Sequence, residues 1–148
     1  MTFEQLIEKL GTQNESEWHQ HANGGGWVQN TANVDASAYV GESAIVLQNA
    51  RVSGNAQVSG NARVSGNAWV SGNAQVYGNA WEKSPLFIIG SRFSATNCKR
   101  GHIQIGCECH TFAWWLENGV KLARNHNFTD SEIEEYRAIV ELFVKIGK

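Results

Sequence analysis

The chain has 148 residues, of which 42% are hydrophobic and 18% charged, and its formal net charge is −2. This is the composition of a folded globular protein, and no segment has the apolar run that a membrane-spanning helix needs. The charge is uneven: residues 1–50 hold six acidic residues against one lysine (−5), whereas residues 83–126 hold six basic residues against two acidic ones (+4). The basic segment suits an anionic small ligand but is too weakly charged to predict a nucleic-acid-binding surface.

The first residues of the chain and its cysteines give a prediction of the cellular compartment in which the protein is found. The first residues, Met-Thr-Phe-Glu-Gln, are neither basic nor apolar enough for a targeting signal, which predicts a cytoplasmic protein. Cys98, Cys107 and Cys109 are odd in number and lie within one segment. This pattern argues against a disulfide framework and suits a reducing compartment.

Residues 1–32 are predicted to form an N-terminal helix and a glycine-rich loop. Thr2 and Gln5 match a capping box, the apolar residues that follow share one helix face, and Gly11 ends the helix. We expect this helix to cap the region that follows.

The glycine-rich loop carries candidate binding residues. His19 and His21 are two positions apart and can face the same side of an extended chain, while three glycines at 24–26 let the backbone approach a ligand closely. The alternative is a flexible loop in which Trp27 plugs the first turn of the next region. We retain both histidines and Trp27 as candidate ligand-binding residues.

Residues 33–80 consist of eight consecutive six-residue units. They read NVDASA, YVGESA, IVLQNA, RVSGNA, QVSGNA, RVSGNA, WVSGNA and QVYGNA. Valine always occupies the second place and alanine the sixth. A period of six scatters these residues around a helix but places them on one face of an extended chain. Glycines at 54, 60, 66, 72 and 78, each followed by Asn, favour a bend with positive φ. Each unit is therefore one short strand and one bend.

These units resemble those of hexapeptide-repeat proteins. The resemblance covers about a third of the chain and implies a mainly β fold, with a short left-handed parallel β-helix at residues 33–82. It also implies a homotrimer. Taken with the C-terminal segment described below, the array resembles small hexapeptide-repeat proteins of bacteriophages and prophages, which would place the protein in the host-cell cytoplasm.

Three units per turn place residues 18 apart above one another, at a spacing of about 4.8 Å. The outward first places then form columns, with Arg51 on Trp69, Gln57 on Gln75 and Arg63 on Trp81. Large apolar side chains exposed on such a wall usually mark a contact surface. Trp69 and Trp81 are therefore expected to lie either in a trimer interface or against a stacking ligand.

Residues 83–148 are predicted to form an α+β cap, which begins where the repeat breaks at Pro85. Residues 86–90 and 102–106 are typical of two strands of a β-hairpin, joined by the polar and basic residues 91–101.

Two helices are predicted to complete this cap. The first begins at His110 or Thr111 and has an apolar stripe that includes Trp115. The second begins after Thr129, whose capping box with Glu132 precedes another apolar stripe.

The histidines and cysteines of this chain suggest three kinds of chemistry: acyl transfer, zinc binding and nucleophilic catalysis by a Cys–His pair. Many hexapeptide-repeat proteins are acyltransferases with a histidine base, so transfer from acyl-CoA is the enzymatic alternative, with His19 or His21 as the base. However, residues 33–80 contain neither a histidine nor an inserted loop. The cysteines and His110 lack the two-residue gaps of zinc ligands, and a Cys–His nucleophile there lacks an orienting acid. We predict no catalytic residue, no metal and no cofactor.

The remaining interpretation is a non-enzymatic, homotrimeric binding protein that binds or sequesters a small anionic, nucleotide-like host molecule, as in host defence evasion. A guanidinium holds phosphate through paired hydrogen bonds, and an indole stacks on a base. A structural or assembly scaffold is the further alternative. The candidate ligand-binding residues are His19, His21, Trp27, Arg51, Arg63, Trp69, Trp81, Arg92, Lys99, Arg100, His102 and His110.

Overall fold

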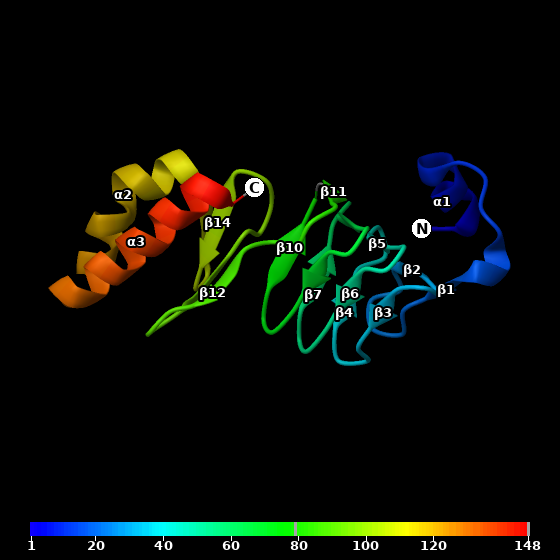
Figure 1. Ribbon diagram of the computed structural model, residues 1–148, viewed down its shortest axis with the longest axis horizontal. Coiled ribbons are helices and arrows are strands. Elements are labelled where there is room, and N and C mark those ends of the chain that lie inside the picture. Colours follow the sequence, from blue (N-terminus) through cyan, green and yellow to red (C-terminus); the bar gives the residue numbers. More distant parts are fainter. Residues whose placement is uncertain (79, 148) are drawn as a thin grey trace. The chain divides into compact units, whose positions relative to one another are not determined.

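The computed structural model describes residues 1–78 and 80–147 (Figure 1). The chain divides into two compact units, Met1–Ser84 and Pro85–Lys148, called here the solenoid unit and the C-terminal unit. Each unit has its own core and is described separately.

The solenoid unit is a parallel β-solenoid of about three turns, as the repeat predicted. Its strands are β2 (Trp27–Gln29), β3 (Asn33–Val34), β4 (Tyr39–Val40), β5 (Ile45–Val46), β6 (Arg51–Val52), β7 (Gln57–Ser59), β8 (Arg63–Val64), β9 (Trp69–Val70), β10 (Gln75–Tyr77) and β11 (Ala80–Trp81). They form three walls, which we call the Trp27 sheet (β2-β5-β8-β11, with β1 at its edge), the Trp69 sheet (β3-β6-β9) and the Tyr39 sheet (β4-β7-β10). Parallel pairing begins at β2, before the first hexapeptide unit.

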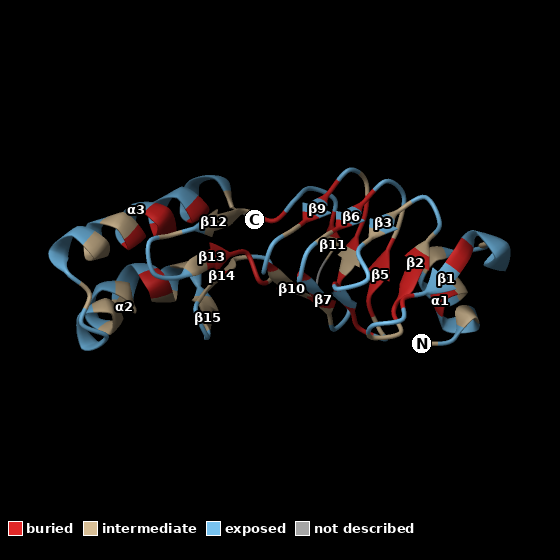
Figure 2. Ribbon diagram, turned by 90° about the horizontal axis from the view of Figure 1, so that it is seen from below, coloured by how far each residue is buried: buried red, intermediate tan, exposed pale blue. Residues whose placement is uncertain are grey.

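The valine and alanine places fill the interior of the solenoid. The repeat valines from Val40 to Val76 are all fully buried, and the repeat alanines from Ala38 to Ala74 are 0–1% exposed. Figure 2 shows these buried residues on successive strands, with exposed residues at the bends. The glycine of each VSGNA unit has a φ of about +60°, as at Gly54 and Gly60. This conformation is inexpensive for glycine and turns the chain from one wall to the next.

One unit of the repeat, IVLQNA, makes the same bend without glycine. Gln48 stands at the glycine place with a φ of +60°, a conformation that is unfavourable for a residue with a side chain. Its backbone N–H donates to Gln29 Oε1 at 2.7 Å, and its own Oε1 accepts from Gly66 N at 2.7 Å. These hydrogen bonds between successive turns offset the backbone strain.

The N-terminal segment covers one wall of the solenoid. It comprises α1 (Phe3–Leu10), the 3₁₀ turn η1 (Glu15–Glu17) and β1 (Trp18–Gln20), and β1 pairs antiparallel with β2. The predicted capping box between Thr2 and Gln5 is present. Leu6 of α1 clusters with Trp18, Trp27 and Ile45, which are all buried. The predicted helical cap therefore seals the outer face of the Trp27 sheet.

The last solenoid strand departs from the 18-residue register. Ala80 pairs with Arg63 and Trp81 pairs with Val64, a separation of 17 residues, whereas Arg51 pairs with Trp69 at 18. Trp81 thus continues the inward valine position and is only 3% exposed. The prediction that Arg63 stacks on Trp81 is wrong. The separation of 17 residues shifts the register by one position, so Trp81 takes an inward place.

The C-terminal unit is a four-stranded antiparallel sheet with two helices. Its elements are β12 (Phe87–Ile89), β13 (Ser94–Thr96), β14 (His102–Ile105), β15 (Glu108–Thr111), α2 (Phe112–Asn125) and α3 (Asp130–Ile146), and the sheet order is β12-β13-β14-β15. The two predicted strands are confirmed, but the expected two-stranded hairpin is wrong. The added strands have the sequences Ser-Ala-Thr and Glu-Cys-His-Thr, which lack the apolar alternation of a recognisable strand.

Both predicted helix starts in this unit are confirmed. Thr111 accepts a hydrogen bond from Trp114 N and caps α2, and Thr129 forms the full capping box with Glu132 at the start of α3. The core joins both helices to the sheet through Ala95, Ile103, Trp115, Tyr136, Ile139, Val140 and Phe143.

The cysteines correct a second expectation. Cys98 and Cys109 are joined by a disulfide, and Cys107 is free and exposed. Cys98 follows β13 and Cys109 lies in β15, so the pair spans the intervening strand β14. The expected absence of a disulfide is wrong, because the contact between these cysteines arises from strand order and not from their number or spacing.

The interior valines should dominate the stability of the solenoid unit. Val58→Ala removes buried methyl groups from the central turn and is expected to lower the free energy of unfolding by about 1.5–3 kcal/mol. Urea denaturation measures this change. Asn55→Ala, at an exposed bend nearby, is the control and should cost less than about 0.5 kcal/mol. Equal losses in both variants would contradict the assignment of Val58 to the core.

Candidate functional site

The Trp69 sheet carries a cation over an exposed aromatic ring. The Arg51 guanidinium carbon lies 6.0 Å from the centroid of the Trp69 ring, as the 18-residue stacking predicted. Trp69 is 51% exposed. Its indole N–H donates to Ser53 Oγ at 2.8 Å, and its backbone N–H donates to Ser84 Oγ at 2.8 Å. The ring is therefore held in place while half of its surface remains available for contact.

Arg51 is available as a cation on this wall. Among the described residues, no carboxylate lies within ion-pair distance of its guanidinium. Asp35, on the same sheet one turn away, instead accepts a hydrogen bond from Gly54 N at 2.8 Å. A planar guanidinium with free donors beside a fixed indole can hold an anionic group and a flat ring together.

The Tyr39 sheet is the second uncovered wall. Its outward first places are Tyr39, Gln57 and Gln75, which are paired in register along the sheet. Tyr39 is 38% exposed. This column has aromatic and amide groups and no formal charge, so it is suited to packing against another protein surface.

The other candidate residues of the N-terminal segment have structural contacts. Trp27 is buried under α1 and donates its indole N–H to Met1 O at 2.8 Å. His21 is 8% exposed and makes a 2.9 Å hydrogen bond to Ala38 O. His19 is exposed and bonds Asn30 Oδ1 at 2.7 Å. The two histidines therefore contact different elements and do not converge on one site.

Arg63 and Trp81, the second predicted cation–aromatic column, do not form one. Arg63 Nη2 lies 3.5 Å from Lys9 O at the end of α1. Trp81 is buried, and its Nε1 has no hydrogen-bond partner among the described residues. Of the predicted solenoid residues, only Arg51 and Trp69 are brought together.

The predicted basic residues of the C-terminal unit lie in several places. Lys99 and Arg100 belong to the turn before β14, and His102 Nδ1 bonds Arg100 O at 2.9 Å. His110 stacks on Trp114 with ring centroids 3.5 Å apart, and its Nε2 lies 2.7 Å from Glu108 Oε2. His110 is thus paired with Glu108 and not with a thiol.

Arg92 supports the start of α3. Its guanidinium carbon lies 4.2 Å from the Phe128 ring centroid, and its Nε lies 3.6 Å from Glu132 Oε2. The hydrogen bond from the Thr129 backbone N–H has the largest effect and lowers the pKa of Glu132 below its usual value. Burial opposes this lowering, and the Thr129 hydroxyl and the Arg92 charge add to it. The Arg92 backbone N–H donates to the Tyr136 hydroxyl at 2.8 Å. These contacts give Arg92 a structural role.

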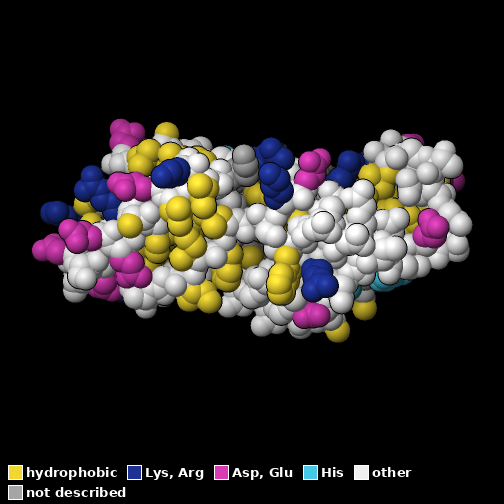
Figure 3. All heavy atoms as spheres, viewed as in Figure 1, with side chains coloured by type: hydrophobic (Ala, Val, Ile, Leu, Met, Phe, Trp, Pro, Cys, Tyr) yellow, Lys and Arg dark blue, Asp and Glu magenta, His cyan; other side chains and the backbone are white. Residues whose placement is uncertain are grey.

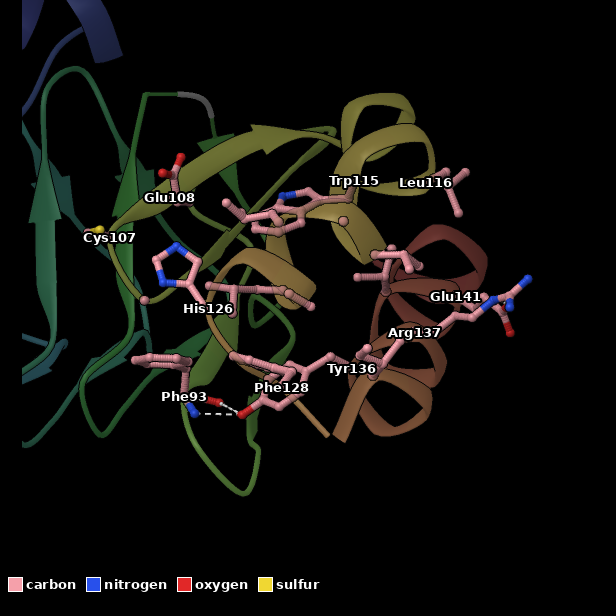
Figure 4. Close-up of a pocket in the computed structure, with 18 residues that line it drawn as sticks. Phe93, Cys107, Glu108, Trp115, Leu116, His126, Phe128, Tyr136, Arg137 and Glu141 are labelled. Carbon is pink, nitrogen blue, oxygen red and sulfur yellow. Dashed lines mark hydrogen bonds and ion pairs between the residues drawn. The ribbon is translucent and has the colours of Figure 1, made fainter. Parts of the chain in front are cut away.

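Sequence reasoning missed a cavity of about 310 Å³ within the C-terminal unit. Figure 4 shows that its lining side chains converge from α2, from α3 and from the β14–β15 turn. The lining residues are Phe93, Ile105, Gly106, Cys107, Glu108, Trp115, Leu116, Gly119, Val120, Leu122, Ala123, His126, Phe128, Ile133, Tyr136, Arg137, Val140 and Glu141. None of the twelve candidate residues lines it. The sequence signal was Gly119 in the middle of α2.

No group of three or more His, Cys, Asp or Glu side chains within residues 1–78 and 80–147 is arranged to hold a metal ion. The helices in this part of the chain are also too short or too polar to span a bilayer.

Comparison with known proteins bears on the solenoid only. The profile of the family described as YdcK beta solenoid repeat matches residues 56–72, which is about one turn of the structure. Together with the three paired walls, this match decides the class. The chain is a β-solenoid repeat protein. No curated protein and no solved structure matches it.

The lowered pKa of Glu132 gives a pH-dependent prediction. Its ionised form stabilises the fold fully above the usual glutamate pKa of about 4.3, and this contribution is lost as the pH falls through the lower folded-state pKa. Glu132→Gln keeps an acceptor for Thr129 N–H but removes the titration. The difference in unfolding free energy between wild type and variant should shrink from about pH 6 to about pH 3.

Urea denaturation across this pH range measures that difference. Glu134→Gln, on the same helix, controls for the loss of one negative charge. If the difference in unfolding free energy between wild type and Glu132→Gln stays constant with pH, the proposed stabilisation by ionised Glu132 is contradicted.

Proposed function

We propose that this protein is a non-enzymatic, homotrimeric binding protein of the left-handed hexapeptide-repeat type, and that it holds a small anionic, nucleotide-like molecule at the seams between its solenoids. The observation that carries the proposal is the exposed Trp69 ring, which is fixed by Ser53 and accompanied by the Arg51 guanidinium. Within the described part of the chain this guanidinium has no ion-pair partner.

The distribution of covered and uncovered walls supports three-fold assembly. The N-terminal segment already covers the Trp27 sheet, so two different walls remain. A two-fold dimer pairs one patch with itself and would leave the other wall exposed, whereas a closed ring pairs two different patches around the axis. Three triangular prisms arranged this way bring the Trp69 sheet of one protomer against the Tyr39 sheet of the next.

The chemistry of the seam supports the ligand class. A guanidinium binds phosphate oxygens through paired hydrogen bonds, and an indole face stacks on a base. Within one protomer the Arg51–Trp69 pair is open to solvent on one side. A neighbouring wall would close that side and remove water, which strengthens both the charge interaction and the stacking.

Binding without turnover is the simplest use of such a seam. The solenoid wall offers no histidine within residues 33–80 to act as a general base, and His21 is committed to Ala38 O. Because the array resembles proteins of bacteriophages and prophages, we propose that the bound molecule is a host signal and that its sequestration in the host cytoplasm counters host defence.

Assembly can be tested separately from binding. Trp69→Lys places a charge in the proposed interface and is expected to convert the trimer to monomers, because an unpaired buried charge is strongly unfavourable. Sedimentation velocity measures the oligomeric state. Glu117→Gln, on an exposed part of α2, is a control with the same change of one unit in net charge. A wild-type protein that is monomeric at micromolar concentration would overturn the trimer.

Ligand retention is tested by native mass spectrometry of the protein purified from phage-infected cells. The wild type should carry an additional mass of nucleotide size, and Arg51→Gln should remain trimeric but lose at least about tenfold in occupancy, since charge-assisted phosphate contacts contribute more than about 1.4 kcal/mol. Arg137→Gln is the control from the C-terminal unit. Wild-type trimers without any bound metabolite would remove the ligand proposal and leave a structural scaffold.

A further inference from the structure

The cavity of the C-terminal unit has the size and walls of a small-molecule site. Its volume of about 310 Å³ lies at the lower end of the range for ligand pockets, about 300–1,000 Å³. Phe93, Trp115, Phe128 and Tyr136 supply aromatic walls. Phe93 and Phe128 stack at 6.2 Å, and Phe128 meets Tyr136 edge-on at 5.3 Å. Such a cluster favours a flat aromatic occupant that continues the same ring contacts.

The aromatic walls are fixed by hydrogen bonds and not only by packing. The Tyr136 hydroxyl donates to Phe93 O at 2.9 Å and accepts the backbone N–H of Phe93, contacts that Figure 4 marks with dashed lines. The Trp115 indole N–H donates to Ile103 O at 2.8 Å. Because these anchors lie on different elements, they fix the walls of the cavity relative to one another, as expected for a preformed site.

Gly119 indicates that the space is kept free. A glycine within a helix costs roughly 0.5–1 kcal/mol relative to alanine. Packing does not account for it here: a Cβ at this position would meet only Trp115 Cε3, at an ordinary contact distance of 3.6 Å. Gly119 lines the cavity, and any longer side chain there would reduce the room for a ligand.

The charged groups of the cavity disfavour an anion. Glu108 and Glu141 contribute two carboxylates and Arg137 one guanidinium. Arg137 Nε lies 3.6 Å from Glu141 Oε1, on the exposed side of α3, so its charge is already paired. Glu108 bonds His110 Nε2. His126 also lines the cavity. Because Arg137 and Glu141 offset one another, Glu108 leaves one net negative charge beside that imidazole, and this charge opposes a phosphate or carboxylate ligand.

The surface around this site is apolar as well. Figure 3 shows hydrophobic side chains gathered on the C-terminal unit beside α3. Two cavity-lining residues of α2, Leu116 and Val120, are 56% and 38% exposed. Exposed apolar side chains next to a cavity provide a favourable path for an apolar molecule and lose water contacts when it binds.

We infer that the C-terminal unit binds a small, uncharged aromatic molecule in this cavity, between α2, α3 and the β14–β15 turn. This second site is independent of the proposed solenoid seam, because its lining lies wholly within residues 93–141. Its ligand is uncharged, whereas the ligand proposed for the seam is anionic.

A matched pair of fluorescent probes tests the site on the full-length protein. N-phenyl-1-naphthylamine is neutral, and 1-anilinonaphthalene-8-sulfonate has the same rings with an added sulfonate. At about pH 8, where a histidine is uncharged, the neutral probe should bind saturably with one site per chain. It should bind at least about fivefold more tightly than the sulfonate. No saturable binding, or a preference for the sulfonate, would overturn the inference.

Cavity-filling variants distinguish this site from other apolar surface. Gly119→Leu should weaken binding of N-phenyl-1-naphthylamine at least about tenfold, while the melting temperature should stay equal or rise because a helical glycine is replaced. Ala123→Leu, one turn further along α2, is a second filling variant if the first fails to fold. Lys121→Leu adds the same side chain outside the cavity lining and should leave affinity unchanged.

The variants also separate the two proposals. Trp69→Lys should not alter N-phenyl-1-naphthylamine binding, and Gly119→Leu should not alter the trimer or its retained metabolite. If Gly119→Leu and Ala123→Leu fold and still bind the neutral probe with wild-type affinity, the cavity is not its site and the inference fails.

Discussion

Parallel pairing between residues 18 apart is the constraint on which the solenoid unit depends. A strand of two or three residues makes too few hydrogen bonds to be stable by itself, so each one relies on the strands above and below it. The pairing also fixes which side chains point inward, because a shift of one residue reverses the face. The valine column from Val40 to Val76 is the result of keeping that register.

The end of the solenoid shows what happens when the register changes. β11 pairs one residue early, so an indole that would have stood outside beside Arg63 enters the core beside Val64. The same type of residue at Trp69, where the register is kept, stays half exposed with Arg51 beside it. The different environments of the two tryptophans therefore follow from strand register, and only one of them is available for recognition.

The sequence predicted the solenoid well because its determinants are local and repeated. Val, Ala and Gly recur at fixed places, and eight repetitions leave little ambiguity about strand, bend and spacing. The helix starts at Thr111 and Thr129 were equally predictable, since a cap depends on residues three apart. Strands β13 and β15 were not, because their polar sequences become strands only through neighbours on β12 and β14.

The candidate sites differ in predictability for the same reason. Arg51 and Trp69 are joined by the repeat period, so their contact could be read directly from the sequence. The disulfide between Cys98 and Cys109 and the pairing of His110 with Glu108 depend on how four strands are ordered. The C-terminal cavity depends on the spacing of two helices from the sheet, which no local pattern specifies.

Gly119 is the cavity residue that stands out in the sequence, but the sequence does not say why it is glycine. In sequence it lowers the helix propensity of α2 without ending the helix. Only the structure shows that a side chain would fit there without a clash and that the resulting space is bounded by aromatic rings. Gly119 weakens α2 and relieves no steric conflict, but it leaves space in the cavity. The second ligand is therefore assigned to the cavity and not to the exposed surface of α2.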